Sequence, residues 1–263
     1  MRRYLPRRLV PILMYHRMGS IGRPSRSWLE PDLFEEGLDR LKRGGFAVLD
    51  LAALAERIRL GERMPRRAVA LTFDDGWLDT YAAALPILVR FRVPATVFLV
   101  SGRIGLREYV GWGEIREMRS CGITFGAHTV SHPRLTEIPP EQARGEIEDS
   151  KKQLEDGLGE EVPTFCYPYG FFNRGVRDMV QAAGFRAACC NTPGRGWPDG
   201  DPFALKRVSV TYRMRGRAAW AAAMSGYYVF FKELRRGDKG YLRSSLGRRV
   251  GAADRAHGCT ERL

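Results

Sequence analysis

Ala68-Val69-Ala70-Leu71-Thr72-Phe73-Asp74-Asp75-Gly76-Trp77 is an apolar, partly β-branched run that ends in two carboxylates and a glycine. This pattern predicts a buried strand that delivers acidic side chains to one end of a sheet. Two adjacent aspartates repel each other and are costly to remove from water unless a cation or a shared proton lies between them. The pair therefore indicates either a metal or shared-proton site, or a solvated turn in which Asp75 caps the next helix.

Helical and strand-like patterns alternate along the rest of the chain. Gly45, Gly122 and Gly184 each separate a helical pattern from an apolar run, which is typical of a helix-to-strand connection. We expect strands at residues 9–16, 46–49, 68–73, 94–100, 123–127, 164–167, 186–190 and 207–210, and helices at 31–43, 52–60, 80–91, 114–121, 140–158 and 176–183, the third kinked at Pro86. This α/β alternation predicts a parallel sheet covered by helices, and about seven such units favour a distorted (β/α) barrel.

The barrel domain is expected to span residues 1–236. Its last element is an apolar, aromatic segment at 218–234, which we interpret as a helix packed on the barrel, with a membrane-surface helix as the alternative. Residues 237–263 are rich in glycine and arginine and are expected to form a poorly ordered basic tail.

The charge balance narrows the class of partner. The 263 residues carry a formal net charge of +13 with a pI near 9.9, which favours anionic partners such as acidic glycans or membrane headgroups. Basic residues are not interleaved with aromatic ones, so we expect no nucleic-acid partner. A peripheral contact with an anionic membrane is a further expectation, and the sequence indicates no oligomeric state.

Cysteine usage and the amino terminus bear on localisation. The five cysteines contain no CxxC pair, which argues against a disulfide framework and a thiolate zinc site and favours a reducing compartment. The apolar stretch at residues 9–15 is short, contains Pro11 and lacks a cleavage signal, and no run reaches the roughly 18 to 20 apolar residues of a membrane span. We therefore expect a cytoplasmic or peripherally membrane-bound protein.

A histidine pair follows another predicted strand. His128 comes directly after the strand at 123–127, and His132 lies four residues later, a spacing that in a helical turn places both imidazoles on one side. The pair stands out because the chain has only 4 histidines. Active sites of barrel enzymes lie at the carboxyl ends of the strands, so the pair is expected near Asp74 and Asp75.

Two neutral imidazoles and one carboxylate form a three-ligand set that leaves positions open for water and substrate. This is the arrangement of catalytic rather than structural zinc. The metal would lower the pKa of a water molecule, and a second carboxylate would take its proton. The residues therefore predict a metal-assisted hydrolase with one divalent ion, most readily Zn²⁺, with Co²⁺, Ni²⁺ or Mn²⁺ as alternatives.

With these motifs in order, residues 10–210 resemble the polysaccharide deacetylases, carbohydrate esterase family 4, with the chitooligosaccharide deacetylase homology domain. Thr72-Phe73-Asp74-Asp75-Gly76 is similar to the family's first motif, which implies Asp74 as catalytic base and Asp75 as metal ligand. His128-Thr129-Val130-Ser131-His132-Pro133 is similar to the second and implies two histidine ligands.

The third motif is similar to Phe165-Cys166-Tyr167-Pro168-Tyr169-Gly170, which implies that the Tyr169 N–H faces the developing oxyanion. The resemblance implies a distorted (β/α) barrel and removal of an acetyl group from an N-acetylated oligo- or polysaccharide.

The chain departs from the family at two places. Many members carry an arginine at the position of Cys166 to orient the base, and Arg207 is our candidate replacement. The histidine that serves as general acid in a later family motif has no counterpart after residues 208–210, so His16, at the end of the first strand, is the candidate acid or substrate contact. A hydrogen-bonded rim histidine is the alternative for His16.

Other features allow two interpretations each. Several aromatic side chains near the motifs could stack on sugar rings or simply pack, namely Trp77, Trp112, Phe171, Phe172 and Trp197. Asp199 and Asp201 could assist the site or make turns. The alternative functions are a catalytically weak carbohydrate-binding protein that keeps the barrel, and a phosphatase, which would need a nucleophile-x-acid spacing that Asp74-Asp75 lacks.

Overall fold

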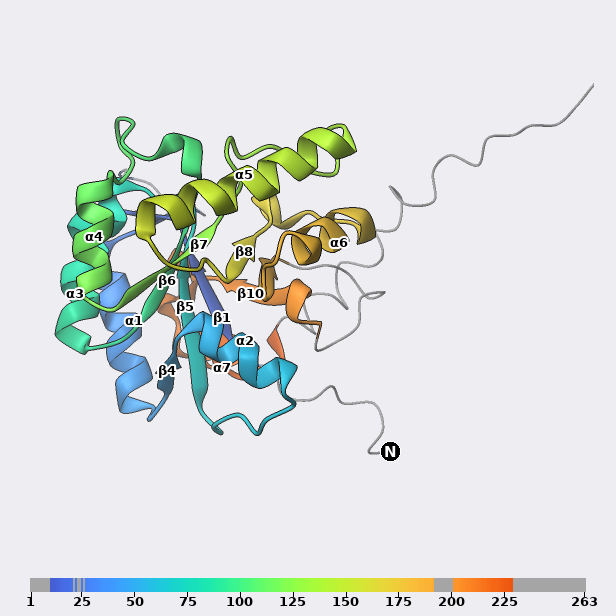
Figure 1. Cartoon of the computed structure of the whole chain (residues 1–263). Helices are drawn as coiled ribbons and strands as arrows, with labels where there is room; N and C mark the ends of the chain where they lie inside the picture. Colours follow the sequence, from blue (N-terminus) through green and yellow to red (C-terminus); the bar gives the residue numbers. More distant parts are fainter. Residues whose placement is uncertain (1–9, 21, 23–24, 26, 192–200, 229–263) are drawn as a thin grey trace, which may run out of the picture.

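Seven parallel strands close into a barrel in the computed structural model, which describes residues 10–20, 22, 25, 27–191 and 201–228 (Figure 1). The main sheet has eight strands in the order β1-β10-β9-β8-β7-β6-β5-β4, and a further pairing of β1 with β5 closes the ring and leaves β4 outside it. The ring strands are β1 (Ile12–Tyr15), β5 (Ala68–Phe73), β6 (Ala95–Leu99), β7 (Ile123–Ala127), β8 (Thr164–Cys166), β9 (Ala187–Cys190) and β10 (Leu205–Ser209). The predicted distorted barrel is confirmed.

Three short strands lie outside the ring. β4 (Ala47–Leu49) pairs with the first half of β5, while β6 pairs with the last two residues of β5. β2 (Arg17–Met18) and β3 (Trp28–Leu29) pair with each other in parallel directly after the first barrel strand. The sequence pattern did not predict β2 and β3, because two residues cannot show a strand period.

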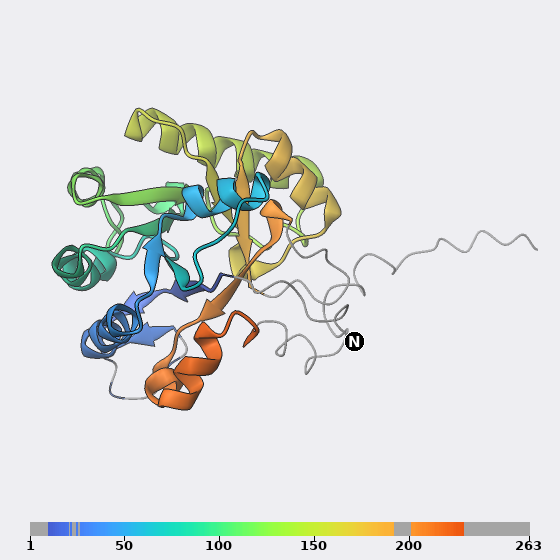
Figure 2. The same cartoon turned by 90° about the horizontal axis from the view of Figure 1, so that it is seen from below.

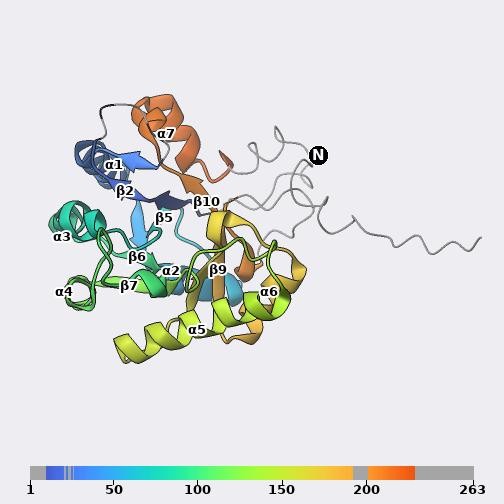
Figure 3. The same cartoon turned by 90° about the horizontal axis from the view of Figure 1, so that it is seen from above.

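Helices surround the barrel, and Figure 3 shows α1 and α7 side by side on one flank. The helices are α1 (Pro31–Arg43), α2 (Leu51–Arg59), α3 (Leu85–Phe91), α4 (Trp112–Ser120), α5 (Pro140–Leu158), α6 (Arg174–Ala182) and α7 (Arg217–Met224). Short helical turns are η1 (Thr80–Ala84), η2 (Ser101–Arg103), η3 (Pro168–Gly170), η4 (Pro202–Ala204) and η5 (Tyr212–Arg215). The kink predicted at Pro86 is a π-helical turn, η1, followed by α3, because proline cannot donate to the preceding turn.

Alternate residues of each strand belong to two different cores. Outward side chains such as Leu13, Leu71 and Phe125 pack under the helices. Inward side chains such as Ile12 and Ala70 form a second cluster inside the barrel with Phe98, Cys166, Ala187, Cys189 and Leu205, and Leu51, Leu54 and Ala55 of α2 join it. In the view from below, α2 lies across the strands (Figure 2). Helix α2 therefore closes one end of the barrel and leaves the other end for chemistry.

The same alternation determines which side chains point into the barrel at its open end. In β5 the inward positions are Ala68, Ala70 and Thr72, so the next inward position is Asp74; His16 follows β1 and His128 follows β7 in the same phase. Arg207 is inward on β10, in register with Ile12, and its side chain is 1% exposed.

The described part of the last predicted helix packs on the barrel. Trp220 of α7 lies against Gly37 of α1, where an added Cβ would be 3.2 Å from the indole. Helix α7 ends at Met224, and the tail predicted for residues 237–263 lies outside the described residues. Every helix in the described part of the chain is too short or too polar to cross a membrane.

Candidate active site

A left-handed turn separates the two carboxylates that follow β5. Asp75 has φ 74° and Gly76 has φ 73°, so the chain reverses immediately after Asp74. Asp74 stays inside the barrel with its side chain 4% exposed, while the Asp75 side chain is 14% exposed. Gly76 is required here because a Cβ would lie 2.8 Å from Leu99 as well as demand positive φ. Adjacent residues thus face two different environments.

The loop that carries both histidines is not the helical turn that the spacing predicted. Thr129 and His132 have φ values of 65° and 67°, and the His132 N–H donates to the Thr129 hydroxyl at 2.9 Å. Glu146 of α5 accepts hydrogen bonds from the N–H groups of Val130 and Ser131, both at 2.8 Å. Side-chain acceptors therefore replace the helical backbone bonds, and the imidazoles still meet.

The Glu146 carboxylate holds the whole loop from outside the site. Because it satisfies two backbone N–H groups and the Ser131 hydroxyl, Glu146→Ala is expected to lower the free energy of unfolding by about 1–3 kcal/mol. We also expect any affinity of the candidate site for a divalent cation to fall by roughly tenfold, because the loop no longer holds His128 and His132 in place. Calorimetry and chelator competition measure the two effects. Glu148→Ala, on an exposed face of α5, is the matched control and should change neither quantity.

The three expected ligand atoms form a compact triangle. The Nε2 atoms of His128 and His132 are 3.2 Å apart, and Asp75 Oδ1 lies 3.6 Å from the first and 3.4 Å from the second. Two ligands bound tetrahedrally to zinc at about 2.05 Å are about 3.3 Å apart. The spacing of this Asp75, His128 and His132 group therefore fits one small divalent cation.

The protonation states of the His128 and His132 imidazoles also suit the binding of a cation. His128 Nδ1 lies 2.6 Å from the Cys166 carbonyl oxygen, which assigns the proton to Nδ1 and leaves the Nε2 lone pair facing the triangle. Burial lowers the pKa of His128. Burial and the neighbouring His128 lower the pKa of His132 to about 4. Both histidines are therefore neutral near pH 7, as metal ligands must be.

Arg207 binds the Asp74 carboxylate from inside the barrel. Its Nη1 and Nη2 atoms donate to the two Asp74 carboxylate oxygens at 2.6 and 2.8 Å. Burial opposes ionisation of Asp74, but the Arg207 charge, the nearby His16 and the two hydrogen bonds outweigh it, so the pKa of Asp74 lies well below its usual range. The contact predicted for Arg207 is present, and Asp74 is held as a fixed, ionised carboxylate.

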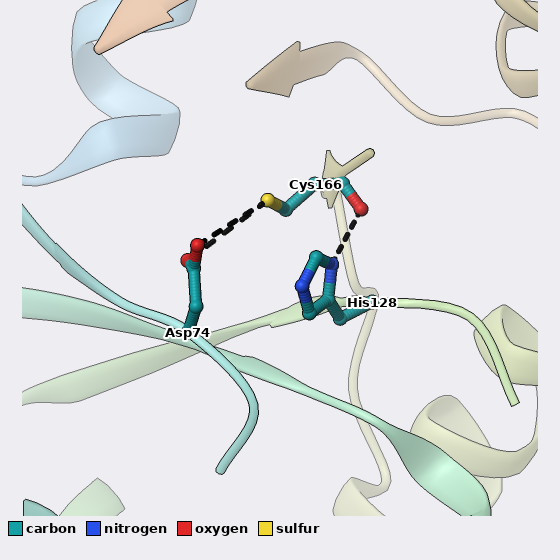
Figure 4. Close-up of side chains that lie close together, drawn as sticks. All are labelled: Asp74, His128 and Cys166. Atoms are coloured by element: carbon teal, nitrogen blue, oxygen red, sulfur yellow. Dashed lines mark hydrogen bonds between the residues drawn. The ribbon is translucent and has the colours of Figure 1, made fainter. Parts of the chain in front are cut away.

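A second group of potential ligands lies deeper, formed by Asp74, His128 and Cys166 (Figure 4). The Cys166 sulfur is 3.9 Å from both Asp74 oxygens and 3.1 Å from Arg207 Nη2. Burial raises the pKa of the Cys166 thiol well above its usual value, and Asp74 is already paired with Arg207. This deeper group therefore lacks the thiolate and the free carboxylate that a cation needs, and the shallower triangle is the candidate metal site.

His16 lies beside Asp74, and Tyr169 lies beside His132. His16 Nε2 is 3.8 Å from Asp74 Oδ2, and its side chain is 28% exposed. The Tyr169 backbone has a left-handed conformation, with φ 59°. The centroid of its ring lies 4.7 Å from that of the His132 ring. The structure thus places all seven predicted site residues at one end of the barrel.

The remaining sequence candidates divide between packing and exposure. Phe172 is buried, whereas Phe171 is 39% exposed beside Tyr169, and Arg134 lies over both rings at 5.0 and 4.7 Å. Asp201 pairs with Arg177 and caps η4, which is a structural role. Trp112 packs against the outer core, and Trp197 and Asp199 lie outside the described residues.

The chain is similar to known proteins in sequence and in fold. The model of the polysaccharide deacetylase family matches residues 61–188. YxkH of Bacillus subtilis, which carries the same family description, is 29% identical over 209 residues, covering 80% of this chain and 74% of YxkH. The chain belongs to the polysaccharide deacetylase family. Members are hydrolases that act on carbon–nitrogen bonds other than peptide bonds, and the family implies an acetylated polysaccharide as substrate.

Two further similarities extend this result. The solved structure of the Streptococcus pyogenes deacetylase PplD in complex with acetate superposes with a TM-score of 0.75 and 25% identity, covering 82% of this chain and 97% of PplD. The poly-β-1,6-N-acetyl-D-glucosamine N-deacetylase of Staphylococcus aureus is 24% identical over 163 residues, which cover 57% of this chain and 56% of that enzyme. The match thus spans little more than half of the staphylococcal protein.

Two features of the site were not predicted from the sequence: the hydrogen bonds by which Glu146 holds the histidine loop, and the contacts that Arg17 makes with Trp28 and Trp77. Glu146 is one of many charged residues on α5, and no local pattern distinguishes it. Arg17 follows His16 directly, so its place beside a candidate acid was the only available signal.

Proposed function

We propose that this deacetylase removes N-acetyl groups from an amino-sugar-containing glycan, using one divalent cation held by Asp75, His128 and His132. The observation that carries the proposal is the ligand triangle, with edges of 3.2 to 3.6 Å, directly beside a second carboxylate that is fixed by Arg207. When bound there, the cation, most readily Zn²⁺, would polarise the amide carbonyl and lower the pKa of a water molecule.

Asp74 serves as the general base in this proposal. Its carboxylate is ionised, faces the open end of the barrel and adjoins the ligand Asp75, so it can accept the proton of the attacking water. Arg207 holds both carboxylate oxygens and thereby fixes their direction. As the water adds to the acetyl carbon, the N–H of Tyr169 is proposed to donate to the developing oxyanion.

His16 is proposed to protonate the leaving amine. Breaking the carbon–nitrogen bond releases acetate and an amine that needs a proton, and His16 is a partly exposed imidazole 3.8 Å from the Asp74 carboxylate. In this scheme Asp74 takes a proton from the attacking water, and His16 gives a proton to the leaving amine.

His16→Gln is therefore expected to lower turnover by about 100-fold, the lower end of the range for general acid catalysis, because water can reach the exposed His16 position. Turnover measured across pH tests this role. Unchanged turnover at every pH would show that His16 is not the acid and would favour the alternative of a hydrogen-bonded rim histidine.

The substrate-facing surface supports a sugar ligand. Tyr169 and Phe171 are 50% and 39% exposed, and Arg134 stacks on both. Exposed aromatic faces with an adjacent guanidinium can pack on the apolar face of a pyranose and donate hydrogen bonds to its hydroxyls. Because a staphylococcal relative is a poly-β-1,6-N-acetyl-D-glucosamine N-deacetylase, we propose an N-acetylglucosamine polymer as the substrate class.

Acetate release from a panel of glycans tests the function. The metal-loaded protein is incubated with chitin oligomers, poly-β-1,6-N-acetylglucosamine and peptidoglycan fragments, with Asp74→Asn as the blank. Release from at least one glycan, absent in the blank, is expected. Glycan binding without acetate release under any metal or pH would favour the alternative of a carbohydrate-binding protein, which the complete ligand set and the Arg207 contact argue against.

The cellular setting stays a prediction. The formal charge of +13 would favour a peripheral contact with anionic membrane, and the cysteine usage favours a reducing compartment.

A further inference from the structure

One side chain outside the ligand triangle bonds directly to its carboxylate. The indole N–H of Trp77 donates to Asp75 Oδ2 at 2.9 Å. The other oxygen, Oδ1, is the one that lies 3.4 and 3.6 Å from the two imidazoles. The two oxygens of Asp75 are therefore assigned to different partners.

The Trp77 ring is fixed on both faces. The Arg17 guanidinium lies 4.1 Å from its centroid, and the Tyr109 ring stacks at 4.4 Å with an interplanar angle of 22°. At these two distances both groups would collide on one face of the ring, so they cover opposite faces of the indole. A backbone bridge between Trp77 and Tyr109 adds a further constraint.

Arg17 is itself held in place by Trp28 and Asp79. Its guanidinium also lies 4.2 Å from the Trp28 ring, and its Nε donates to Asp79. Asp79 in turn accepts from the Met18 N–H at 2.9 Å. A layered stack of Trp28, Arg17, Trp77 and Tyr109 thus joins the β2–β3 pair to the loop before α4, with the indole N–H of Trp77 directed at the metal ligand.

We propose that Trp77 is a positioning residue that aims Asp75 at the cation. The inference deepens the proposed function, because it rests on the cation site of that proposal. Asp75 sits on a left-handed turn, and without the indole its carboxylate could rotate about its side-chain torsions or present both oxygens. The N–H occupies Oδ2 and leaves Oδ1 as the single ligand atom. Partners of this kind typically contribute about 10- to 100-fold to metal affinity.

Two changes at position 77 separate the hydrogen bond from the stack. Trp77→Phe removes the N–H and part of the ring, whereas β-(3-benzothienyl)alanine incorporated at the same position keeps the bicyclic ring and replaces only the N–H by sulfur. Zn²⁺ affinity of the full chain is measured by competition with a chromophoric chelator, and thermal unfolding of the metal-free protein is measured in parallel. Trp112→Phe, at the start of α4 with its indole against Gly157 of α5, is the matched control.

We expect both changes at position 77 to weaken Zn²⁺ binding by about 10- to 100-fold, and Trp112→Phe to leave it within about twofold. The benzothienyl protein should unfold at the wild-type temperature, because the stack remains. Wild-type affinity in the benzothienyl protein would overturn the inference and leave the proposed function intact. Failure of the wild-type protein itself to bind Zn²⁺ would instead overturn the proposed cation site.

Discussion

Arg207→Met is expected to lower the free energy of unfolding by about 3–5 kcal/mol at neutral pH, because it leaves the Asp74 carboxylate buried without its partner. The methionine fills much of the same space inside the barrel, so lost volume contributes little. Deacetylation should fall as well, since the contact that would remain to both carboxylate oxygens, from the Cys166 sulfur at 3.9 Å, is far weaker than the two Arg207 hydrogen bonds. Denaturant unfolding and acetate release measure the two losses.

The pH dependence of this loss has a definite sign. In the wild type the folded-state pKa of Asp74 is depressed, so its contribution to stability is present above the unfolded pKa near 3.9 and is lost as the pH falls through the folded value. In the variant, burial without Arg207 raises the folded pKa above the unfolded one. The variant should therefore regain stability relative to the wild type as the pH is lowered from 7 towards 4.

Two further variants make the test specific. Arg186→Met removes an exposed arginine paired with Glu161 and is expected to change stability by about 1 kcal/mol or less. Combining Arg207→Met with Asp74→Asn removes both charges, so the double variant should lose less than the sum of the single losses. Strictly additive losses would contradict a buried ion pair that acts as a unit.

Asp74→Asn is expected to lower turnover by about 10³- to 10⁴-fold, the upper range for loss of a general base, because the amide cannot accept the proton of the attacking water. The substitution keeps the size of the side chain and leaves Asp75, His128 and His132 unchanged. Bound Zn²⁺ should therefore stay near the wild-type amount, which separates loss of the base from loss of the cation.

Stability is expected to change as well in this variant, because the substitution leaves Arg207 without a carboxylate. Kinetics should therefore be measured below the unfolding transition, at equal amounts of folded protein. Turnover within tenfold of the wild type in folded, Zn²⁺-loaded Asp74→Asn would assign the base to another group.

Much of the fold and site follows from local patterns in the sequence. Apolar runs ending at Asp74 and His128 marked the strand ends, and period-two alternation in β10 is consistent with Arg207 inside the barrel. The Cys166 departure from the family pattern also has a physical explanation. A small side chain there leaves room for Arg207, whose Nη2 lies 3.1 Å from the sulfur, so the guanidinium reaches Asp74 from a different strand.

Other features depend on contacts between distant segments and could not be predicted from local pattern. The four-residue spacing of His128 and His132 is compatible with a helix, but Glu146, from a helix beginning eight residues after His132, selects a left-handed loop instead. The stack on Trp77 joins residues 17, 28 and 109, whose proximity arises only when the barrel closes.

The most direct test of the metal-dependent mechanism measures bound zinc and released acetate in the same samples. The protein is stripped with a chelator, reloaded with increasing Zn²⁺ and assayed on the most reactive acetylated glycan, with Asp75→Asn as the control. Acetate release should be absent from the stripped protein, rise in proportion to bound zinc up to one ion per chain, and stay near zero in Asp75→Asn. Full acetate release from stripped, metal-free protein would contradict the proposed mechanism.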